Sequence, residues 1–280
     1  SDNRVVADLP SSANPQPHVS VRYQFNAIAD GVDQMHRVTR EILMQGAVLL
    51  KLAVGGGVAS NYDPLDVTEY TKAEIQAAVD NAENWGTYVT VHGYTARAVR
   101  LAVDAGVKCI EHGQLIDEDT AKLLADRGIW LCLQPFPDDQ DAIPFPEGSI
   151  QRTKQLQMVS GTDKAYEYAK KHNVKTAFGT DTLFDAKLAT RQGAQLAKLT
   201  RWYRAAEVLK QATADNAELL ALSGPRNPYP GKLGVVEEGA LADLLLVNGD
   251  PIANIKLIED PEKNFLTILK DGKIYKNIVT

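Results

Sequence analysis

The chain has 280 residues, of which 44% are hydrophobic, and it carries a formal net charge of -6. A chain of this length can bury a sizeable core, and one large α/β domain with a small appendage fits better than several modules. The negative charge is modest and no run of lysine or arginine occurs, which argues against nucleic acid and anionic membranes as partners. No apolar stretch approaches the roughly 20 residues that span a bilayer.

The cysteines and the first residues bear on the compartment. Cys109 and Cys132 do not make a disulfide framework, and each sits in an apolar run where a small buried side chain is expected. Residues 1–18 are polar and contain proline, and they do not resemble a signal peptide. We therefore favour a cytoplasmic location, with a periplasmic or secreted one left open because a leader can be cleaved or missing.

From residue 31 onward, segments of helical period alternate with short apolar runs that are typical of buried parallel strands. The predicted helices cover residues 31–45, 72–84, 96–105, 117–126 and 162–171, and the predicted strands cover residues 47–54, 87–92, 107–112, 129–134 and 174–181. Residues 135–148 are rich in proline and acid, and we expect them to form a lid that decides substrate choice.

Five βα units in series predict part of a (β/α)8 TIM-type barrel. An open doubly wound sheet is the alternative, but it concentrates ligands at one switch point, whereas here polar residues end nearly every strand. Two further strands, near residues 242–247 and 265–269, and a turn at Asp271 and Gly272 predict a small β appendage. We expect a partial barrel over residues 1–230 and part of a small β-sandwich domain over residues 231–280.

Four polar residues end predicted strands, where a barrel collects its active site. They are Lys51, His92, His112 and Asp181. The interval from Lys51 to His92 fits one βα unit with a long loop, that from His92 to His112 fits one tight unit, and that from His112 to Asp181 fits two units. The chain therefore returns each time to the same end of the barrel. A lysine, two histidines and an aspartate on one rim can hold a metal and activate a water molecule, which indicates metal-assisted hydrolysis.

Each of these residues also has an ordinary explanation. Lys51 can form a salt bridge at a strand end, the histidines can be satisfied by hydrogen bonds, and Asp181 can cap the helix that follows. Their joint occurrence at matching strand ends favours a site. A lysine between two leucines is costly to bury without a compensating role, and in a desolvated site its amine can carry a carboxylate from CO2, an oxygen ligand able to bridge two metals.

Other candidate residues are weaker. His36 and His172 have the placement of surface residues, and nothing in the spacing of His18 supports a role. The glycine run at residues 55–60, GGGVAS, lacks the lysine and Ser/Thr ending of a phosphate-binding loop. We interpret it sterically, because glycines let the backbone pass close to a metal centre or a substrate.

The stretches KLAVGGGVAS, VTVHGYTARAVRLAVDAGVKCIEHGQLID, AFGTDT and GVVEEGALADLLLVNGDPIANI together resemble the amidohydrolase superfamily. The similarity is to its prolidase-like (Xaa-Pro dipeptidase) and imidazolonepropionase-related branch, and it covers nearly the whole chain from about Gly31 onward. This resemblance implies that barrel strands four to eight are present. It also implies a hydrolase acting on a peptide-like amide, with a small molecule or a dipeptide as substrate.

The resemblance assigns roles to the candidate residues. Lys51 matches a carboxylated lysine that bridges two divalent metals, usually zinc, and His92 and His112 match ligands of the second metal. Asp181 matches the aspartate that binds the first metal and shuttles the proton. Tyr94 matches a tyrosine near the substrate carboxylate. We also expect a homo-oligomer.

The chain departs from the family pattern in one respect. The family's first strand supplies a His-x-His pair to the first metal, and no such pair occurs in these residues. We therefore expect the sequence to be one piece of a longer protein, or to act with a complementary fragment. Two alternatives stay open: a hydrolase of cyclic amides, imidazolones, lactones or esters, and an inactive remnant without the His-x-His ligands.

Overall fold

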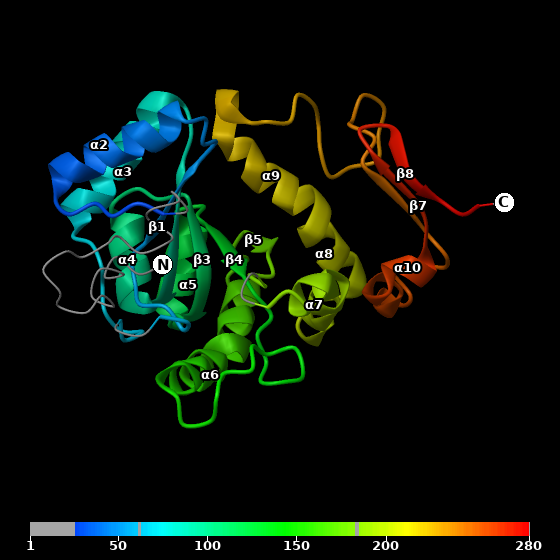
Figure 1. Ribbon diagram of the computed structural model, residues 1–280, viewed down its shortest axis with the longest axis horizontal. Coiled ribbons are helices and arrows are strands. Elements are labelled where there is room, and N and C mark those ends of the chain that lie inside the picture. The colour runs from blue at the N-terminus through cyan, green and yellow to red at the C-terminus, as the bar shows by residue number, and fades with distance from the viewer. Residues whose placement is uncertain (1–25, 61–62, 183–184, 280) are drawn as a thin grey trace, which may run out of the picture. The chain divides into compact units, whose positions relative to one another are not determined.

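A computed structural model of the chain describes residues 26–60, 63–182 and 185–279 (Figure 1). His18 and the rest of the first segment lie outside the described residues. The chain divides into two compact units, which are described separately. The first comprises Ser1–Leu131, Phe145–Val174 and Ser223–Arg226, and the second comprises Cys132–Pro144, Lys175–Leu222 and Asn227–Thr280. The predicted domain boundary between residues 230 and 231 stays a prediction.

Five strands form one sheet in the order β1-β2-β3-β4-β5, which is also their order in the sequence. Their bounds are β1 (Leu50–Ala53), β2 (Val89–Thr95), β3 (Cys109–Leu115), β4 (Trp130–Leu133) and β5 (Thr176–Phe178). β2 pairs in parallel with both β1 and β3. A helix separates each strand from the next, which is the predicted βα alternation.

The helices of the first unit are α2 (Val32–Met44), α3 (Lys72–Trp85), α4 (Ala96–Asp104), α5 (Glu118–Asp126) and α6 (Ile150–Lys171). Local chemistry sets several of their ends. Thr71 and Glu74 form a capping box at the start of α3, and Gly86, with φ of 76°, ends it in the left-handed conformation. The first four helices lie close to their predicted ranges.

Helix α6 differs from its prediction because it begins at Ile150 rather than near residue 162. Its first half buries Lys154 and Gln155, so the apolar period that reveals the second half is missing there. Ser149 caps the true start by accepting a hydrogen bond from the Arg152 N–H at 3.1 Å. Residues 149–161 are therefore mostly helix.

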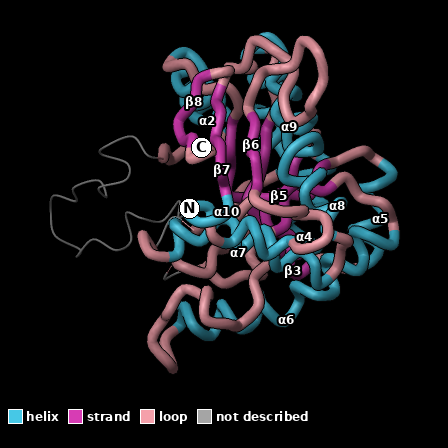
Figure 2. Tube along the Cα trace, turned by 90° about the vertical axis from the view of Figure 1, so that its right-hand side faces the viewer, coloured by secondary structure: helices cyan, strands magenta, loops and turns pink. Residues whose placement is uncertain are grey.

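The second unit contains short helices and a small sheet. The helical elements are η2 (Leu188–Arg191), α7 (Gln192–Lys198), η3 (Leu199–Arg201), α8 (Ala205–Lys210), the π-helical turn Gln211–Asp215, α9 (Asn216–Leu220), η6 (Ile255–Glu259) and α10 (Pro261–Asn264). The sheet order is β6-β7-β8, from Leu244–Val247, Phe265–Lys270 and Lys273–Asn277 (Figure 2). Both of its pairings are antiparallel.

The hairpin between β7 and β8 turns at the two residues expected from the sequence. Asp271 has φ of 50° and Gly272 has φ of 73°, and two consecutive positive φ values suit the twist of a tight antiparallel hairpin. The small antiparallel sheet is the predicted C-terminal appendage.

Candidate functional site

Strands β2 and β3 bring three of the predicted site residues together in the first unit. The ring centroids of His92 and His112 are 4.5 Å apart, and the Tyr94 ring lies 4.9 Å from His92 and 5.1 Å from His112. All three are buried, at 8%, 2% and 4% exposure for His92, His112 and Tyr94. We call these three residues the histidine cluster.

The backbone at the ends of these strands is irregular. The register between β2 and β3 shifts between Gly93 and Thr95, and Gly93 aligns with His112. His112 has φ of 81°, an uncommon value for a residue with a side chain. Bulges that re-aim a side chain and backbone held at positive φ are both enriched at functional sites, so the geometry supports a role for His112.

His92 is held in one tautomer. Its Nε2 lies 3.1 Å from the carbonyl oxygen of Gly56, and because a carbonyl can only accept, Nε2 carries the hydrogen. Burial lowers the pKa of His92 to about 3, with a further lowering by the charge of Lys51 and opposing effects of the Gly56 carbonyl and Asp63. The ring is therefore neutral near pH 7, with the lone pair on Nδ1, which is the form that binds a metal.

The glycine run contacts this histidine through the Gly56 carbonyl, and its predicted approach to a metal centre or a substrate stays a prediction. A Cβ atom on Gly56 would lie 2.1 Å from the carbonyl oxygen of Pro64, so only glycine fits there. The Gly57 N–H donates to Asp63 Oδ2 at 2.8 Å, and Ser60 Oγ donates to the same carboxylate. Asp63 thus holds the segment that supplies the Gly56 carbonyl to His92.

A buried lysine completes this support, and sequence patterns gave no sign of it. Lys154 Nζ on α6 donates to the carbonyl oxygens of Ser60 at 2.6 Å and Asp63 at 3.1 Å, and it lies 3.5 Å from Asp63 Oδ1. The two side chains are 8% and 0% exposed for Lys154 and Asp63. Since a buried charge is stable only when paired and hydrogen-bonded, the two groups depend on each other.

Lys51 shares a sheet face with His92 but is not buried. It is the second residue of β1 and aligns with Thr90, while Ala53 aligns with His92. Residues two apart on a strand face the same side, so the side chains of Lys51 and His92 are on one face. Lys51 is exposed in the described structure, so the expectation that it is desolvated is not met there. Its carboxylation stays a prediction.

Asp181 belongs to the second unit, three residues after the end of β5. It is partly buried, and its φ of 50° is in the left-handed region. Thr180 and Thr182, on either side of it, both hydrogen-bond to the side chain of Gln192, at 2.7 and 2.9 Å. The alternative that Asp181 caps the helix that follows stays a prediction.

The histidine cluster is suited to a metal in the nature of its donors. Two adjacent imidazoles, one of them neutral by burial and with a defined free nitrogen, are ligands that zinc accepts. Within residues 26–60, 63–182 and 185–279, His, Cys, Asp and Glu side chains form no metal-binding group of three or more. A metal here therefore needs donors of other kinds or from elsewhere, and Lys51 is the candidate on the same sheet face.

The remaining candidates have structural roles. His36 Nδ1 lies 3.3 Å from Asn81 Oδ1, and His172 Nε2 lies 3.0 Å from Glu118 Oε1. Cys109 and Cys132 are buried free thiols, as expected. Among the described helices, none combines the length and the apolar character needed to cross a bilayer.

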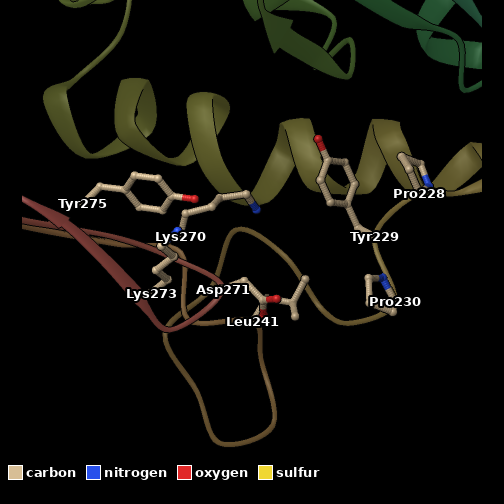
Figure 3. Close-up of a pocket in the computed structure, with 8 residues that line it drawn as sticks. All are labelled: Pro228, Tyr229, Pro230, Leu241, Lys270, Asp271, Lys273 and Tyr275. Atoms are coloured by element: carbon tan, nitrogen blue, oxygen red, sulfur yellow. The ribbon is translucent and has the colours of Figure 1, made fainter.

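A separate pocket in the second unit contains none of the predicted site residues. Its lining consists of Pro228, Tyr229, Pro230, Leu241, Lys270, Asp271, Lys273 and Tyr275 (Figure 3). Lys270 Nζ lies 5.3 Å from the centre of the Tyr229 ring and 2.6 Å from Asp243 Oδ2. Lys270 therefore has a structural role in this pocket, through a cation–π contact with Tyr229 and an ion pair with Asp243.

Comparisons with known proteins identify the family of this chain. A profile described as the Amidohydrolase family matches residues 5–279. Ochratoxinase from Aspergillus niger is 30% identical over 251 residues, covering 89% of this chain and 50% of that protein. The chain thus spans about half the length of that curated relative.

Two solved structures show the same architecture. A prolidase complexed with N-methylphosphonate-L-proline matches with a TM-score of 0.85 and 30% identity, covering 97% of this chain and 66% of that one. A Xaa-Pro dipeptidase with methionine bound in its active site matches with a TM-score of 0.78 and 28% identity, covering 89% of this chain and 60% of that one. Such neighbours are of the TIM-barrel type, and the predicted fold class is confirmed.

Proposed function

Because the chain belongs to the amidohydrolase family, we propose that it forms part of a metal-dependent hydrolase that cleaves peptide-like amide bonds, with dipeptides as substrates in the manner of a prolidase. The observation that carries this proposal is the histidine cluster, in which burial keeps His92 neutral and the Gly56 carbonyl leaves its Nδ1 free. The similarity to a prolidase and a Xaa-Pro dipeptidase supports the substrate class.

The proposal includes two divalent ions, with zinc favoured by the nitrogen donors. His92 and His112 would hold one ion, Asp181 the other, and a carboxylated Lys51 would bridge them. When bound, the ions supply Lewis-acid activation of water and of the scissile carbonyl.

Two side chains have further proposed roles, in proton transfer and in substrate binding. Asp181 accepts a proton from the attacking water and delivers it to the leaving nitrogen, so that a C–O bond forms as the C–N bond breaks. Tyr94, buried against both imidazoles, is placed to contact the substrate and is the candidate partner of its carboxylate. No nucleophilic side chain is required.

A second substrate class is favoured by one observation, the 30% identity to an enzyme named for ochratoxin. Ochratoxin therefore belongs in the assay beside the dipeptides. Cyclic amides, imidazolones, lactones and esters test the other hydrolase alternative.

The test begins with purified protein supplied with zinc and bicarbonate. We expect elemental analysis to find two zinc ions per chain, binding of N-methylphosphonate-L-proline, and turnover of Xaa-Pro dipeptides. Turnover of ochratoxin or of a lactone alone would replace the dipeptide proposal. A folded protein that binds neither zinc nor the phosphonate would contradict the metal-dependent function and favour the inactive remnant. Light scattering on the same sample tests the proposed homo-oligomer.

A further inference from the structure

Two side-chain amides hold the segment that carries Asp181. The first belongs to Asn216, the first residue of α9. The N–H of Phe178 donates to Asn216 Oδ1 at 2.9 Å, and Asn216 Nδ2 donates to the carbonyl oxygen of Phe178 at 3.0 Å. Phe178 is the last residue of β5, and this paired contact satisfies both of its backbone polar groups.

The second amide belongs to Gln192, the first residue of α7. Thr180 Oγ1 donates to Gln192 Oε1 at 2.7 Å, and Gln192 Nε2 donates to Thr182 Oγ1 at 2.9 Å. One planar amide therefore binds the residue before Asp181 and the residue after it. The two threonine hydroxyls are themselves 3.4 Å apart.

We call the Gln192 and Asn216 amides, with their hydrogen bonds, the amide clamp. The backbone of Asp181 has a conformation that needs such support. A φ of 50° is disfavoured for a residue with a side chain, although aspartate tolerates it better than most. Such a conformation persists when the surrounding structure over-determines it. Bonds on both sides of the residue, from Gln192, and at Phe178, from Asn216, supply that constraint.

Gln192 is itself fixed. Its neighbour Arg191 pairs with Asp141, whose side chain is 2% exposed, and Lys198 Nζ at the end of α7 lies 2.9 Å from the same carboxylate. A Cβ atom on Gly193 would lie 1.9 Å from the carbonyl oxygen of Ile258, so α7 is seated directly on η6. The clamp therefore acts from a rigid support.

We propose that Gln192 and Asn216 are positioning residues that hold Asp181 in the backbone conformation in which it binds metal and transfers a proton. This proposal rests on the proposed function of Asp181. Neither residue is a catalytic residue, because neither contacts the reacting atoms in the proposal. Their effect must pass through Asp181, and that requirement makes the proposal testable.

The first experiment is a double-mutant cycle on zinc affinity, measured by competition with a chelator. We expect Gln192→Ala to weaken zinc binding by about 10-fold, the lower end for loss of an outer-shell partner. In an Asp181→Asn background the same substitution should cause no further loss. The control is Thr190→Val. The Thr190 hydroxyl donates to the Lys187 carbonyl rather than to Gln192, so removing this hydroxyl should leave the zinc affinity unchanged.

Equal losses in both backgrounds, or a Gln192→Ala protein that matches the control, would overturn the proposal. Thr180→Val and Thr182→Val remove the partner hydroxyls without disturbing α7, and they should reproduce the loss if Gln192→Ala fails to fold. Wild-type protein that binds zinc while Gln192→Ala has no effect defeats the positioning proposal alone. Wild-type protein that binds no zinc defeats the proposed function.

A second experiment does not depend on metal or activity. Hydrogen exchange followed by mass spectrometry should show faster exchange across residues 176–182 in Gln192→Ala and Asn216→Ala than in wild type or Thr190→Val. Unchanged exchange in both variants would mean that the amides do not hold the segment, and would overturn the proposal even in a protein that binds no zinc.

Discussion

The histidine cluster and the Asp181 segment contain the proposed chemistry, but the protein holds them in different ways. His92 and His112 lie within strands of seven residues and are buried. Backbone pairing supports both, and a buried ion pair supports the segment that contacts His92. Asp181 follows a strand of three residues and is held by two side-chain amides. We therefore expect substitutions around the histidines to change the free energy of unfolding, and substitutions around Asp181 to change the local backbone geometry.

The largest expected effect is on turnover. Asp181→Asn keeps the size of the side chain and its tolerance of positive φ but removes the base, so we expect turnover of a Xaa-Pro dipeptide to fall by at least ~100-fold. The free energy of unfolding should stay within ~0.5 kcal/mol of wild type, and much of the metal should remain. Steady-state kinetics, urea unfolding and elemental analysis measure the three quantities.

Asp185→Asn is the matched control, because the Asp185 carboxylate accepts the N–H groups of Lys187 and Leu188 at 2.8 and 3.0 Å. Asparagine keeps an oxygen that can accept both N–H groups, so the variant should stay within ~0.5 kcal/mol of wild type in stability and leave turnover nearly unchanged. Retained turnover in Asp181→Asn would remove Asp181 from its proposed role.

The buried ion pair should give the largest effect on folding. Lys154→Met leaves the Asp63 carboxylate buried and without its cation, and we expect a loss of ~3–5 kcal/mol in the free energy of unfolding. Urea unfolding measures the loss. The variant that also carries Asp63→Asn should lose less than the sum of the single changes, because the two groups share one interaction.

An exposed pair provides the comparison for Lys154. Arg37 and Glu41 form an i,i+4 pair whose side chains are 65% and 48% exposed, and Arg37→Ala should cost no more than ~0.5 kcal/mol. If Lys154→Met cost as little, the support of His92 through Asp63 would have no energetic basis.

Acid should destabilise the metal-free protein through His92. Its pKa is lowered by burial from 6.5 to about 3, so the folded state binds the proton more weakly than the unfolded state. The stabilisation is present above pH 6.5 and is lost as the pH falls toward 3, by roughly 3 kcal/mol over the first two pH units. The free energies of unfolding at pH 7 and 4.5 measure this loss. In His92→Gln, the difference between the two free energies should be smaller by the same amount.

Only a small effect on folding is expected at Lys51. Because its side chain is exposed, Lys51→Met should change the free energy of unfolding by less than ~0.5 kcal/mol. If the lysine is carboxylated and bridges two ions, the same variant should lose zinc, and wild-type protein supplied with ¹³C-bicarbonate should show a carbamate NMR signal that the variant lacks. Wild-type protein with zinc but without that signal would contradict the bridging role.

Much of the fold could be predicted because its signals are local. The apolar runs around Val91, Ile110 and Leu131 indicate buried strands, and the helices between them have the expected period. The second half of α6 was found by the same signal, but its first half was not, since Lys154 and Gln155 occupy buried positions there. The sequence between residues 182 and 241 gave no prediction of a helix or a strand. The structure has short helices there, interrupted by 3-10 and π turns.

The sequence by itself determined the α/β class, the hairpin at Asp271 and Gly272, and the placement of His92 and His112 on successive strands, since period and turn chemistry depend on near neighbours. The expectation that these histidines end their strands is wrong, because β2 and β3 each continue three residues further. Only the tertiary structure decided which nitrogen of His92 is free, that Lys154 is buried against Asp63, and that Gln192 joins Thr180 to Thr182. These contacts join residues from different elements, and they form only when packing makes each buried polar group find its partner.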